Sequence, residues 1–400
     1  MKNKPLNGIL VIDLTRVLAG PFCTMVLQDL GAEIIKIEAP ISGDDSRHFG
    51  PFLDENKSKS AYFMSINCGK KSLSVDLKKE EGKNILTDLI KISDVVVDNF
   101  RPGTMERLGF SEEFIKEANP SIIYASTSGF GYTGPDSDRA AYDMIIQAVS
   151  GIMSVTGPES GESVRVGSSI SDIVAGMYTA IGITSALYRR EKTDIGARID
   201  VAMLDSTVSV LENAIARYQV TGEAPLPLGS RHPSITPFDA FSTKNSKIVI
   251  CAGNDKLFNN LCSILDIEDL VDNPKYSSNE VRTKNHQELK MELNKVLETN
   301  TTNYWLLKLA DANIPSAKIN NVKDLFENPQ IKQRNMLIPV EGEEDFQTAG
   351  FPVKFGGEPD LLKKGKVPEL GEHNEDVLKG VLKYSDAIIE TLYQKKVLSK

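Results

Sequence analysis

One acidic residue at the start of a long predicted helix is the first candidate for chemistry. Asp172 lies in VGSSISDIVAGMYTAIGITSALYRR (166–190), which indicates a short extended segment and then a helix. Asp is among the best N-cap residues, so a simple cap is one interpretation. The positive end of a helix dipole also stabilises a carboxylate, and an ionised carboxylate can attack an activated acyl group such as a thioester. The two interpretations are compatible, and we predict that Asp172 serves as both the cap and the nucleophile.

Three polar segments that follow predicted strands could hold a polyphosphate. The segment LTRVLAGPFC places Arg16 before a helix with proline in its first turn, and a helix N-terminus near an arginine suits an anion. The segment NCGKKSLSVDLKKEEGK carries five lysines, and DNFRPGTMERLGF adds Asn99, Arg101 and Arg107. A simple turn and a solvated charged surface are the plainer interpretations of these segments.

Common nucleotide, nucleophile and metal motifs are missing. The sequence has no GxGxxG after the first predicted strand, no GxxxxGK[ST] and no GxSxG. Its four histidines are far apart and its four cysteines have no CxxC spacing, so we expect neither a metal site nor a disulfide framework. Free thiols of this kind fit a reducing cytoplasm, which is the location we predict.

Charge and hydropathy narrow the class of partner. The 400 residues carry a formal net charge of −9, and an acidic chain is poorly suited to nucleic acid or anionic membrane through its overall field. No window approaches the ~20 apolar residues of a membrane span. We therefore expect no nucleic-acid partner, no membrane partner, and small molecules as ligands.

Alternating strand and helix patterns in the first half of the chain must position these groups. Strands are predicted at 8–14, 32–40, 94–100 and 121–131, and helices at 19–31, 80–93 and 111–119. This rhythm indicates an α/β fold with a parallel sheet and helices on both faces. Ligands of such sheets bind beyond the carboxyl ends of the strands, where the polar segments above are found.

The composition changes in the middle of the chain. The stretch TGEAPLPLGSRHPSITPF (221–238) is rich in Pro, Gly and Ser and is typical of a linker. After it, KIVICAGN predicts a strand, followed by several helices. We expect four parts, namely a large α/β domain at 1–200, a linker at 201–224, a smaller α+β domain at 225–325 and a C-terminal segment at 326–400 that ends in helices.

The sequence resembles the class III CoA-transferases, or CaiB/BaiF family, which includes formyl-CoA transferase, carnitine CoA-transferase and α-methylacyl-CoA racemase. The resemblance lies in LNGILVIDLTRVLAGPFCTMVLQDLGAEIIKIEAP, GKKSLSVDLKKEEGK, DVVVDNFRPGTMERLGF, PSIIYASTSGFGYTGP, SDIVAGMYTAIGITSALYRR and LGEHNEDVL. These motifs are in order and cover nearly the whole chain.

The resemblance implies a fold, a site and a reaction. The large domain would hold a Rossmann-like parallel sheet, and two subunits would interlock like rings in a homodimer. The family's catalytic aspartate falls on Asp172. Its CoA-binding positions fall on Arg16, Val17, Leu18, Ala19, Val75, Lys78, Asn99, Phe100, Arg107, Tyr142 and Met203. CoA and acyl-CoA would be substrates, with no tightly bound cofactor and no metal.

The implied reaction moves CoA from an acyl-CoA donor to a free carboxylate through an anhydride and a β-aspartyl-CoA thioester on Asp172. A racemase-like epimerase is one alternative, but its catalytic histidine is replaced here by Tyr142, a poor base because tyrosine has a pKa near ~10. A non-catalytic CoA-ester-binding protein is another alternative, although such a protein would not require a carboxylate beside the thioester.

Three departures from formyl-CoA transferases bear on the substrates. Leu18 replaces a glutamine and AGND replaces a tetraglycine loop, which argues against formyl and oxalate groups. Ala39 replaces an arginine that contacts the phosphates of CoA, so Arg16 or Arg47 could supply part of that grip. The residues 251–255 are a plausible lid.

Overall fold

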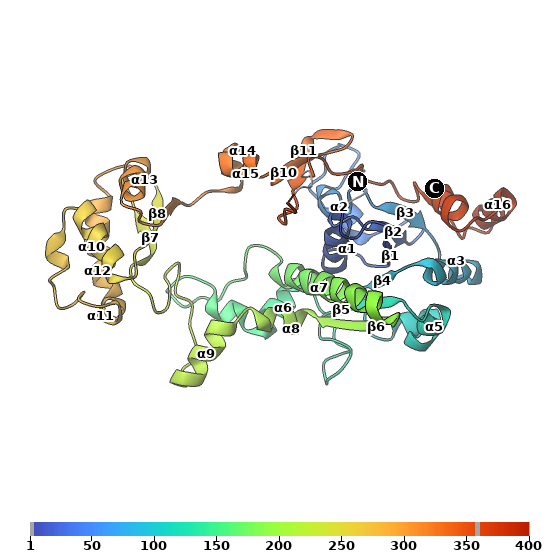
Figure 1. Ribbon diagram of the computed structural model, residues 1–400, viewed down its shortest axis with the longest axis horizontal. Helices are drawn as coiled ribbons and strands as arrows, with labels where there is room; N and C mark the ends of the chain where they lie inside the picture. The colour runs from blue at the N-terminus through green and yellow to red at the C-terminus, as the bar shows by residue number, and fades with distance from the viewer. Residues whose placement is uncertain (1–3, 357–360, 400) are drawn as a thin grey trace. The chain divides into compact units, whose positions relative to one another are not determined.

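The computed structural model describes residues 4–356 and 361–399 and separates into two compact units (Figure 1). The large unit contains the chain up to residue 152, residues 165–216 and the chain from residue 329 onward. The small unit contains residues 153–164 and 217–328. Each unit has its own hydrophobic core.

A six-stranded parallel sheet forms the centre of the large unit, in the order β3-β2-β1-β4-β5-β6. The strands are β1 (Leu10–Asp13), β2 (Glu33–Glu38), β3 (Lys71–Ser74), β4 (Val95–Asp98), β5 (Ile123–Ser128) and β6 (Ala197–Ala202). Because β1 pairs with both β2 and β4, the strand order reverses there, and the loops after β1 and β4 lie on either side of the switch point.

Helices cover both faces of this sheet, so the expected α/β fold is confirmed. One face packs on α1 (Ala19–Asp29) and α7 (Ile170–Thr193). The opposite face packs on α3 (Glu80–Ile92), α5 (Glu112–Ala118) and α16 (Asp386–Gln394), so the end of the chain returns to the first domain (Figure 1). The strand residues alternate between the two cores, as period-two side-chain placement requires.

By length and composition alone, α7 would be able to span a membrane, since it is a 24-residue apolar helix. Half of its most apolar window is buried inside the protein, where Ala180, Ile183 and Leu187 pack against the sheet. These contacts describe a core helix of a folded α/β unit.

The expected linker at 201–224 is helical for most of its length, and the boundary between the two units falls inside it, between residues 216 and 217. It contains α8 (Met203–Ser209) and α9 (Glu212–Thr221). Met203 packs with Ile146 and Ala175, so this segment has apolar contacts that its sequence pattern did not reveal. Residues 153–164, expected in the large domain, belong instead to the small unit.

The small unit has a three-stranded antiparallel sheet, β7-β8-β9, formed by Phe238–Ser242, Lys247–Cys251 and Ser316–Lys318. Its helices are α10 (Asp255–Ile264), α11 (Asn279–Lys284), α12 (His286–Leu297), α13 (Thr302–Asp311) and α14 (Val322–Glu327). Trp305 lies in this core and donates its indole N–H to the carbonyl oxygen of Leu297 at 2.7 Å.

The remaining elements belong to the large unit. They are α2 (Ala61–Asn67), α4 (Thr104–Leu108), α6 (Asp143–Ser150), α15 (Pro329–Gln333), the antiparallel pair β10 (Leu337–Val340) and β11 (Glu343–Ala349), a π-helical turn (Asp376–Val381) and a 3₁₀ turn at Asp45–His48. A further 3₁₀ turn at Ile152–Val155 begins at the last residue of this part of the large unit and continues into the small unit. The small unit adds a 3₁₀ turn at Glu268–Leu270.

Candidate active site

Asp172 lies in the first turn of α7 but does not cap the helix, so that part of the prediction is wrong. Ser169 occupies the N-cap position, and its side chain makes no capping hydrogen bond. The capping carboxylate comes from another element. Asp143, the first residue of α6, accepts a hydrogen bond from the backbone N–H of Ser171 at 3.0 Å.

Asp143 is itself braced within the segment that leads into α7. Its second carboxylate oxygen accepts from Gln147 Nε2 at 2.7 Å, while Gln147 Oε1 accepts from the backbone N–H of Val166 at 2.8 Å. Both side chains are buried. This pair fixes the backbone on either side of the helix start and so positions Asp172. Sequence reasoning missed Asp143, although it directly follows Tyr142, a residue that the resemblance pointed to.

The Asp172 carboxylate has a strongly perturbed acidity. Burial raises the pKa of Asp172 to about 7, and the nearby Asp143 carboxylate adds to the rise. No described residue gives its oxygens a hydrogen bond. The helix dipole was expected to keep this group ionised, but burial and a like charge act in the opposite direction. Both the charged and the neutral form of Asp172 are therefore accessible near neutral pH.

Asp172 lines a cavity of about 190 Å³ in the large unit, together with most of the residues that the resemblance indicated. The predicted residues found there are Arg16, Val17, Leu18, Ala19, Asn99, Phe100, Tyr142, Asp172 and Met203. They come from the loops after β1 and β4, the start of α6, the start of α7 and the start of α8. The fold therefore brings segments nearly two hundred residues apart to one cavity at the switch point.

A second cavity, of about 310 Å³, shares Arg16 and Phe100 with the first. It contains two more predicted residues, Val75 and Lys78, from the segment after β3. Ala39, the position of the missing arginine, also lines it. Two cavities with a common wall suit a long ligand with a reactive end near Asp172 and a polar end near Lys78.

Two predicted residues are placed differently from the expectation. Arg107 lines neither cavity, and its guanidinium donates to Thr104 Oγ1 at 2.7 Å. Asn99 does line the smaller cavity, but its amide group bonds to the backbone of Arg16. Asn99 therefore supports the loop after β1 and does not have a free side chain for a ligand.

The suggestion that Arg47 grips phosphate is wrong. Its guanidinium donates to both oxygens of Glu38, each at 2.7 Å, and stacks over Phe63 at 3.8 Å from the ring centre. A bidentate pair of this kind leaves the guanidinium occupied.

Three arginines line the Asp172 cavity: Arg16, which the resemblance indicated, Arg101, which only the polar-segment pattern indicated, and Arg139, which neither indicated. Arg16 pairs with Asp45 at 3.3 Å, and Arg139 pairs with Asp136 at 2.9 Å. Arg101 has no ion-pair or hydrogen-bond partner for its side chain within residues 4–356 and 361–399. Arg101 is thus the cation of this cavity that is available to a carboxylate. Its position directly after Asn99 and Phe100 was the signal for it.

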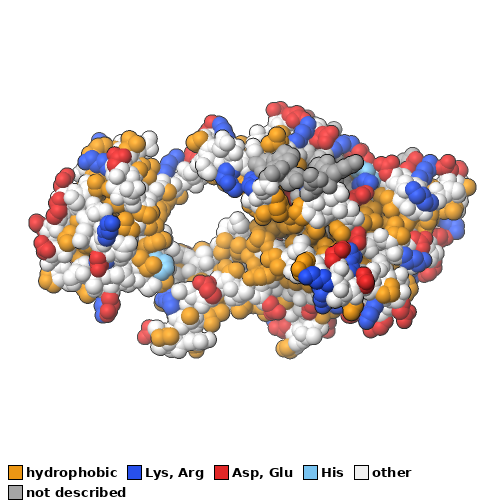
Figure 2. Space-filling view, viewed as in Figure 1, with side chains coloured by type: hydrophobic (Ala, Val, Ile, Leu, Met, Phe, Trp, Pro, Cys, Tyr) orange, Lys and Arg blue, Asp and Glu red, His pale blue; other side chains and the backbone are white. Residues whose placement is uncertain are grey.

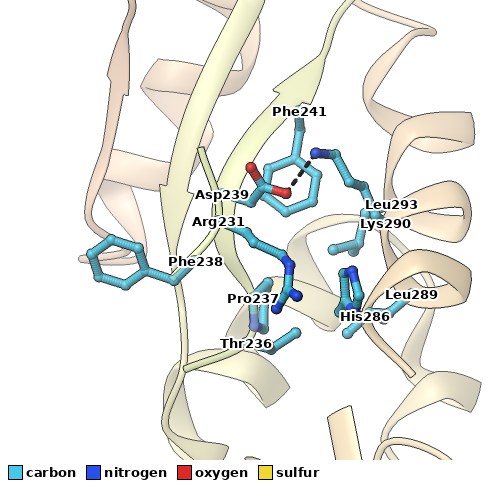
Figure 3. Close-up of a pocket in the computed structure, with 10 residues that line it drawn as sticks. All are labelled: Arg231, Thr236, Pro237, Phe238, Asp239, Phe241, His286, Leu289, Lys290 and Leu293. Carbon is cyan, nitrogen blue, oxygen red and sulfur yellow. Dashed lines mark hydrogen bonds and ion pairs between the residues drawn. The ribbon is translucent and has the colours of Figure 1, made fainter. Parts of the chain in front are cut away.

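A cavity in the small unit is much smaller (Figure 3). About 10 Å³ of space lies between Arg231, His286 and neighbours on β7 and α12, and Lys290 is paired with Asp239. Such a volume holds about one water molecule. The residues 251–255, expected as a lid, join β8 to α10 in this unit, where Arg282 donates to the carbonyl oxygen of Gly253 at 3.0 Å. Their role as a lid stays a prediction.

Comparisons with known proteins agree with this geometry. The family model of CoA-transferase family III matches residues 6–374, and the chain belongs to this family. It is 43% identical over 369 residues to an acetyl-CoA:oxalate CoA-transferase of Acetobacter aceti, covering 92% of this chain and 93% of that one. It is 40% identical over 400 residues to the human succinyl-CoA:glutarate CoA-transferase, covering 99% of this chain and 90% of that one.

The fold is also shared with a solved structure of the family. A CaiB/BaiF family protein from Brucella suis superposes with a TM-score of 0.85 at 36% identity, covering 94% of this chain and 99% of that chain. The chain is therefore a class III CoA-transferase, which moves CoA between acyl-CoA esters and carboxylates, and the predicted class is confirmed.

Proposed function

We propose that this protein transfers CoA from an acyl-CoA donor to a small dicarboxylate through a covalent CoA thioester on Asp172. The observation that carries the proposal is the placement of Asp172, which lies without a hydrogen-bond partner among the described residues in a cavity shared with eight of the expected CoA-binding residues. A nucleophilic carboxylate needs this freedom, because hydrogen bonds to its oxygens would weaken its attack.

The proposed steps keep one activated acyl bond at every stage. The ionised Asp172 carboxylate attacks the thioester carbonyl of the donor, and CoA thiolate leaves to give a mixed anhydride. The thiolate then attacks the aspartyl carbonyl, releasing the donor's carboxylate and forming the β-aspartyl-CoA thioester. The acceptor carboxylate attacks this thioester to form a second anhydride. The thiolate attacks the acceptor's carbonyl, which gives the new acyl-CoA and frees Asp172.

A dicarboxylate acceptor is supported by two independent observations. Arg101 offers an unpaired guanidinium in the Asp172 cavity, and a guanidinium suits bidentate contact with a carboxylate. The two relatives described above are named for oxalate and glutarate, both dicarboxylates. Because of the oxalate relative, we keep oxalate among the acceptors to test despite Leu18.

The epimerase alternative lacks support at the site. No histidine is among the described residues that line the Asp172 cavity, and Tyr142 is 75% exposed. The second alternative, a protein that only binds CoA esters, disagrees with the transferase family to which the chain belongs.

The test of the proposed function is direct trapping. The protein is incubated with succinyl-CoA and hydroxylamine, without an acceptor, and the Asp172 peptide is examined by mass spectrometry. We expect a hydroxamate on Asp172 that Asp172→Asn lacks, and, in a separate assay, oxalyl-CoA or glutaryl-CoA when those acids are added. An unmodified Asp172 in protein that binds succinyl-CoA would contradict the covalent route through Asp172.

We also propose that the protein is an interlocked homodimer. Hydrophobic side chains gather on the visible surface over α6 and α7 (Figure 2). On α7, Met177, Tyr178, Ile181 and Tyr188 are 41–66% exposed, and a second copy would cover them. Sedimentation analysis tests this, and we expect Ile181→Asp to weaken the dimer. A monomeric wild-type protein would contradict the proposal.

A further inference from the structure

The turn between β1 and α1 has an unfavourable backbone at Val17. Its φ angle is +68°, a left-handed conformation that β-branched residues rarely adopt. Only Val17 and Ile41 are β-branched among the described non-glycine residues with positive φ. Such an outlier persists only where its surroundings hold it, and it often marks a functional position.

A buried ion pair holds this turn at two points. The N–H of Val17 donates to Asp44 Oδ1 at 3.1 Å. Asp44 Oδ2 lies 2.8 Å from Lys36 Nζ, and Lys36 also donates to the carbonyl oxygen of Thr15 at 2.7 Å. The side chains of Lys36 and Asp44 are 0% and 1% exposed. One ion pair thus fixes the first and last residues of the three-residue turn 15–17.

The middle of the turn is held from a different strand. Asn99, just beyond β4, accepts from the N–H of Arg16 at 2.9 Å and donates to its carbonyl oxygen at 2.7 Å. The turn is therefore fixed by side chains from both sides of the switch point. Among the side chains of the described residues, only that of Asp44 forms a hydrogen bond to Val17 itself.

The position of this turn determines one wall of the Asp172 cavity. Leu18 and Ala19 follow directly and line that cavity. Ala19 also contacts α7, where a Cβ added to Gly176 would lie 2.6 Å from the Ala19 carbonyl oxygen. Gly176 lies one turn of the helix after Asp172. A change in the conformation of residues 15–17 would therefore alter the packing of α7 beside Asp172.

Asp44 keeps its charge under all ordinary conditions. Burial by itself would raise the pKa of Asp44, but Lys36 and the N–H groups of Ser46 and Val17 outweigh burial and lower the pKa to about 2. The ion pair is thus permanent at the pH of an assay.

We infer that Asp44, with Lys36 as its partner, is a positioning residue that holds the strained Val17 turn so that Val17, Leu18 and Ala19 face the acyl group at Asp172. Asp44 acts through the turn, because its oxygens are directed at Val17, Ser46 and Lys36. This role rests on the proposed function, since it needs a reacting group in that cavity.

The test is a double-mutant cycle between Asp44→Asn and Val17→Gly. Glycine adopts positive φ without strain, so the turn needs no clamp once glycine replaces Val17. We expect Asp44→Asn to lower kcat/KM at least tenfold in the wild-type background and less than threefold in the Val17→Gly background. An equal loss in both backgrounds, or no loss in either, would overturn the inference.

The control variant is Asp29→Asn, at the far end of α1. Asp29 forms a buried ion pair with Lys364, with Nζ–O distances of 2.5 and 2.6 Å, so its loss measures the general effect of breaking a buried pair. Folded Asp29→Asn protein is expected to keep its activity within twofold. A tenfold loss in this control would show that the Asp44 effect is not specific.

A second measurement does not depend on activity. Amide exchange at Val17 is expected to rise at least tenfold in Asp44→Ala, which removes the acceptor of its N–H, and to stay unchanged in Asp29→Ala. Unchanged exchange in Asp44→Ala overturns the inference, whereas a failure of the proposed function would show as a missing hydroxamate on Asp172 in the wild type. If Asp44→Asn does not fold alone, the double variant with Val17→Gly should restore folded protein, and continued unfolding would count against the clamp.

Discussion

The acidity of Asp172 leads to a quantitative prediction for the pH dependence of the reaction. The first step requires the ionised carboxylate, and burial together with Asp143 raises the pKa of Asp172 to about 7. The value of kcat/KM is therefore proportional to the fraction of free enzyme in which Asp172 is ionised. At pH 7 the value of kcat/KM is half of its alkaline plateau, and at pH 6 it is about tenfold lower than that plateau.

The variant Asp143→Asn tests the cause of this acidity. Asparagine keeps an oxygen for the N–H of Ser171 but removes the negative charge that faces Asp172. Since a like charge disfavours the ionised form, its removal lowers the pKa of Asp172. In Asp143→Asn the acidic limb of the pH profile of kcat/KM moves to lower pH. The value of kcat/KM at pH 6 is then a larger fraction of the alkaline plateau than in the wild type.

The assay is kcat/KM for succinyl-CoA with glutarate from pH 5 to pH 9, at constant ionic strength and over the range in which the protein stays folded. Asp143→Ala serves as a comparison, because it removes both the charge and the oxygen that caps α7. For Asp143→Ala we expect the alkaline plateau of kcat/KM to fall, in addition to the shift of the acidic limb to lower pH. A wild-type limb near pH 4, or a limb that does not move in Asp143→Asn, would refute this account of the site.

Other consequences can be measured separately. Folding raises the pKa of Asp172 from 3.8 to about 7, so the free energy of unfolding decreases as pH rises from about 4 to 7. In urea unfolding at pH 8, Asp172→Asn should therefore have a free energy of unfolding up to about 4 kcal/mol higher than the wild type, with no gain at pH 4. Lys78→Ala should weaken CoA binding about tenfold in calorimetry, whereas Lys83→Ala, which removes a lysine paired with Glu80 at 2.8 Å, should not. Arg101→Leu should raise the KM for glutarate about tenfold and the KM for succinyl-CoA by less, because the guanidinium would bind the carboxylate of the acceptor. Equal increases in both KM values would indicate that Arg101 binds CoA instead.

The alternation of strands and helices could be predicted from the sequence because it depends on local patterns. Apolar runs such as VVVD in β4 and the turn chemistry around them identify a buried parallel strand without any knowledge of its neighbours. The resemblance then pointed to Asp172 and to most of the residues that line its cavity. The sequence was less informative at 203–221, where α8 packs through Met203 and α9 follows it, although we expected a linker there.

Other properties of the site depended on the tertiary structure. The N–H of Ser171 finds its partner in Asp143, 28 residues earlier, and the N–H of Val17 finds its partner in Asp44. No periodicity or spacing reveals such pairs, because they form only when distant segments meet.

The same reason explains the error about the charge of Asp172. Its helix position could be predicted from the sequence, and the dipole of that helix favours the ionised form. The acidity is decided instead by how much water reaches the carboxylate and by which charges face it. Those two quantities are set by the packed structure around Asp172, whereas residue type and helix position are properties of the chain itself.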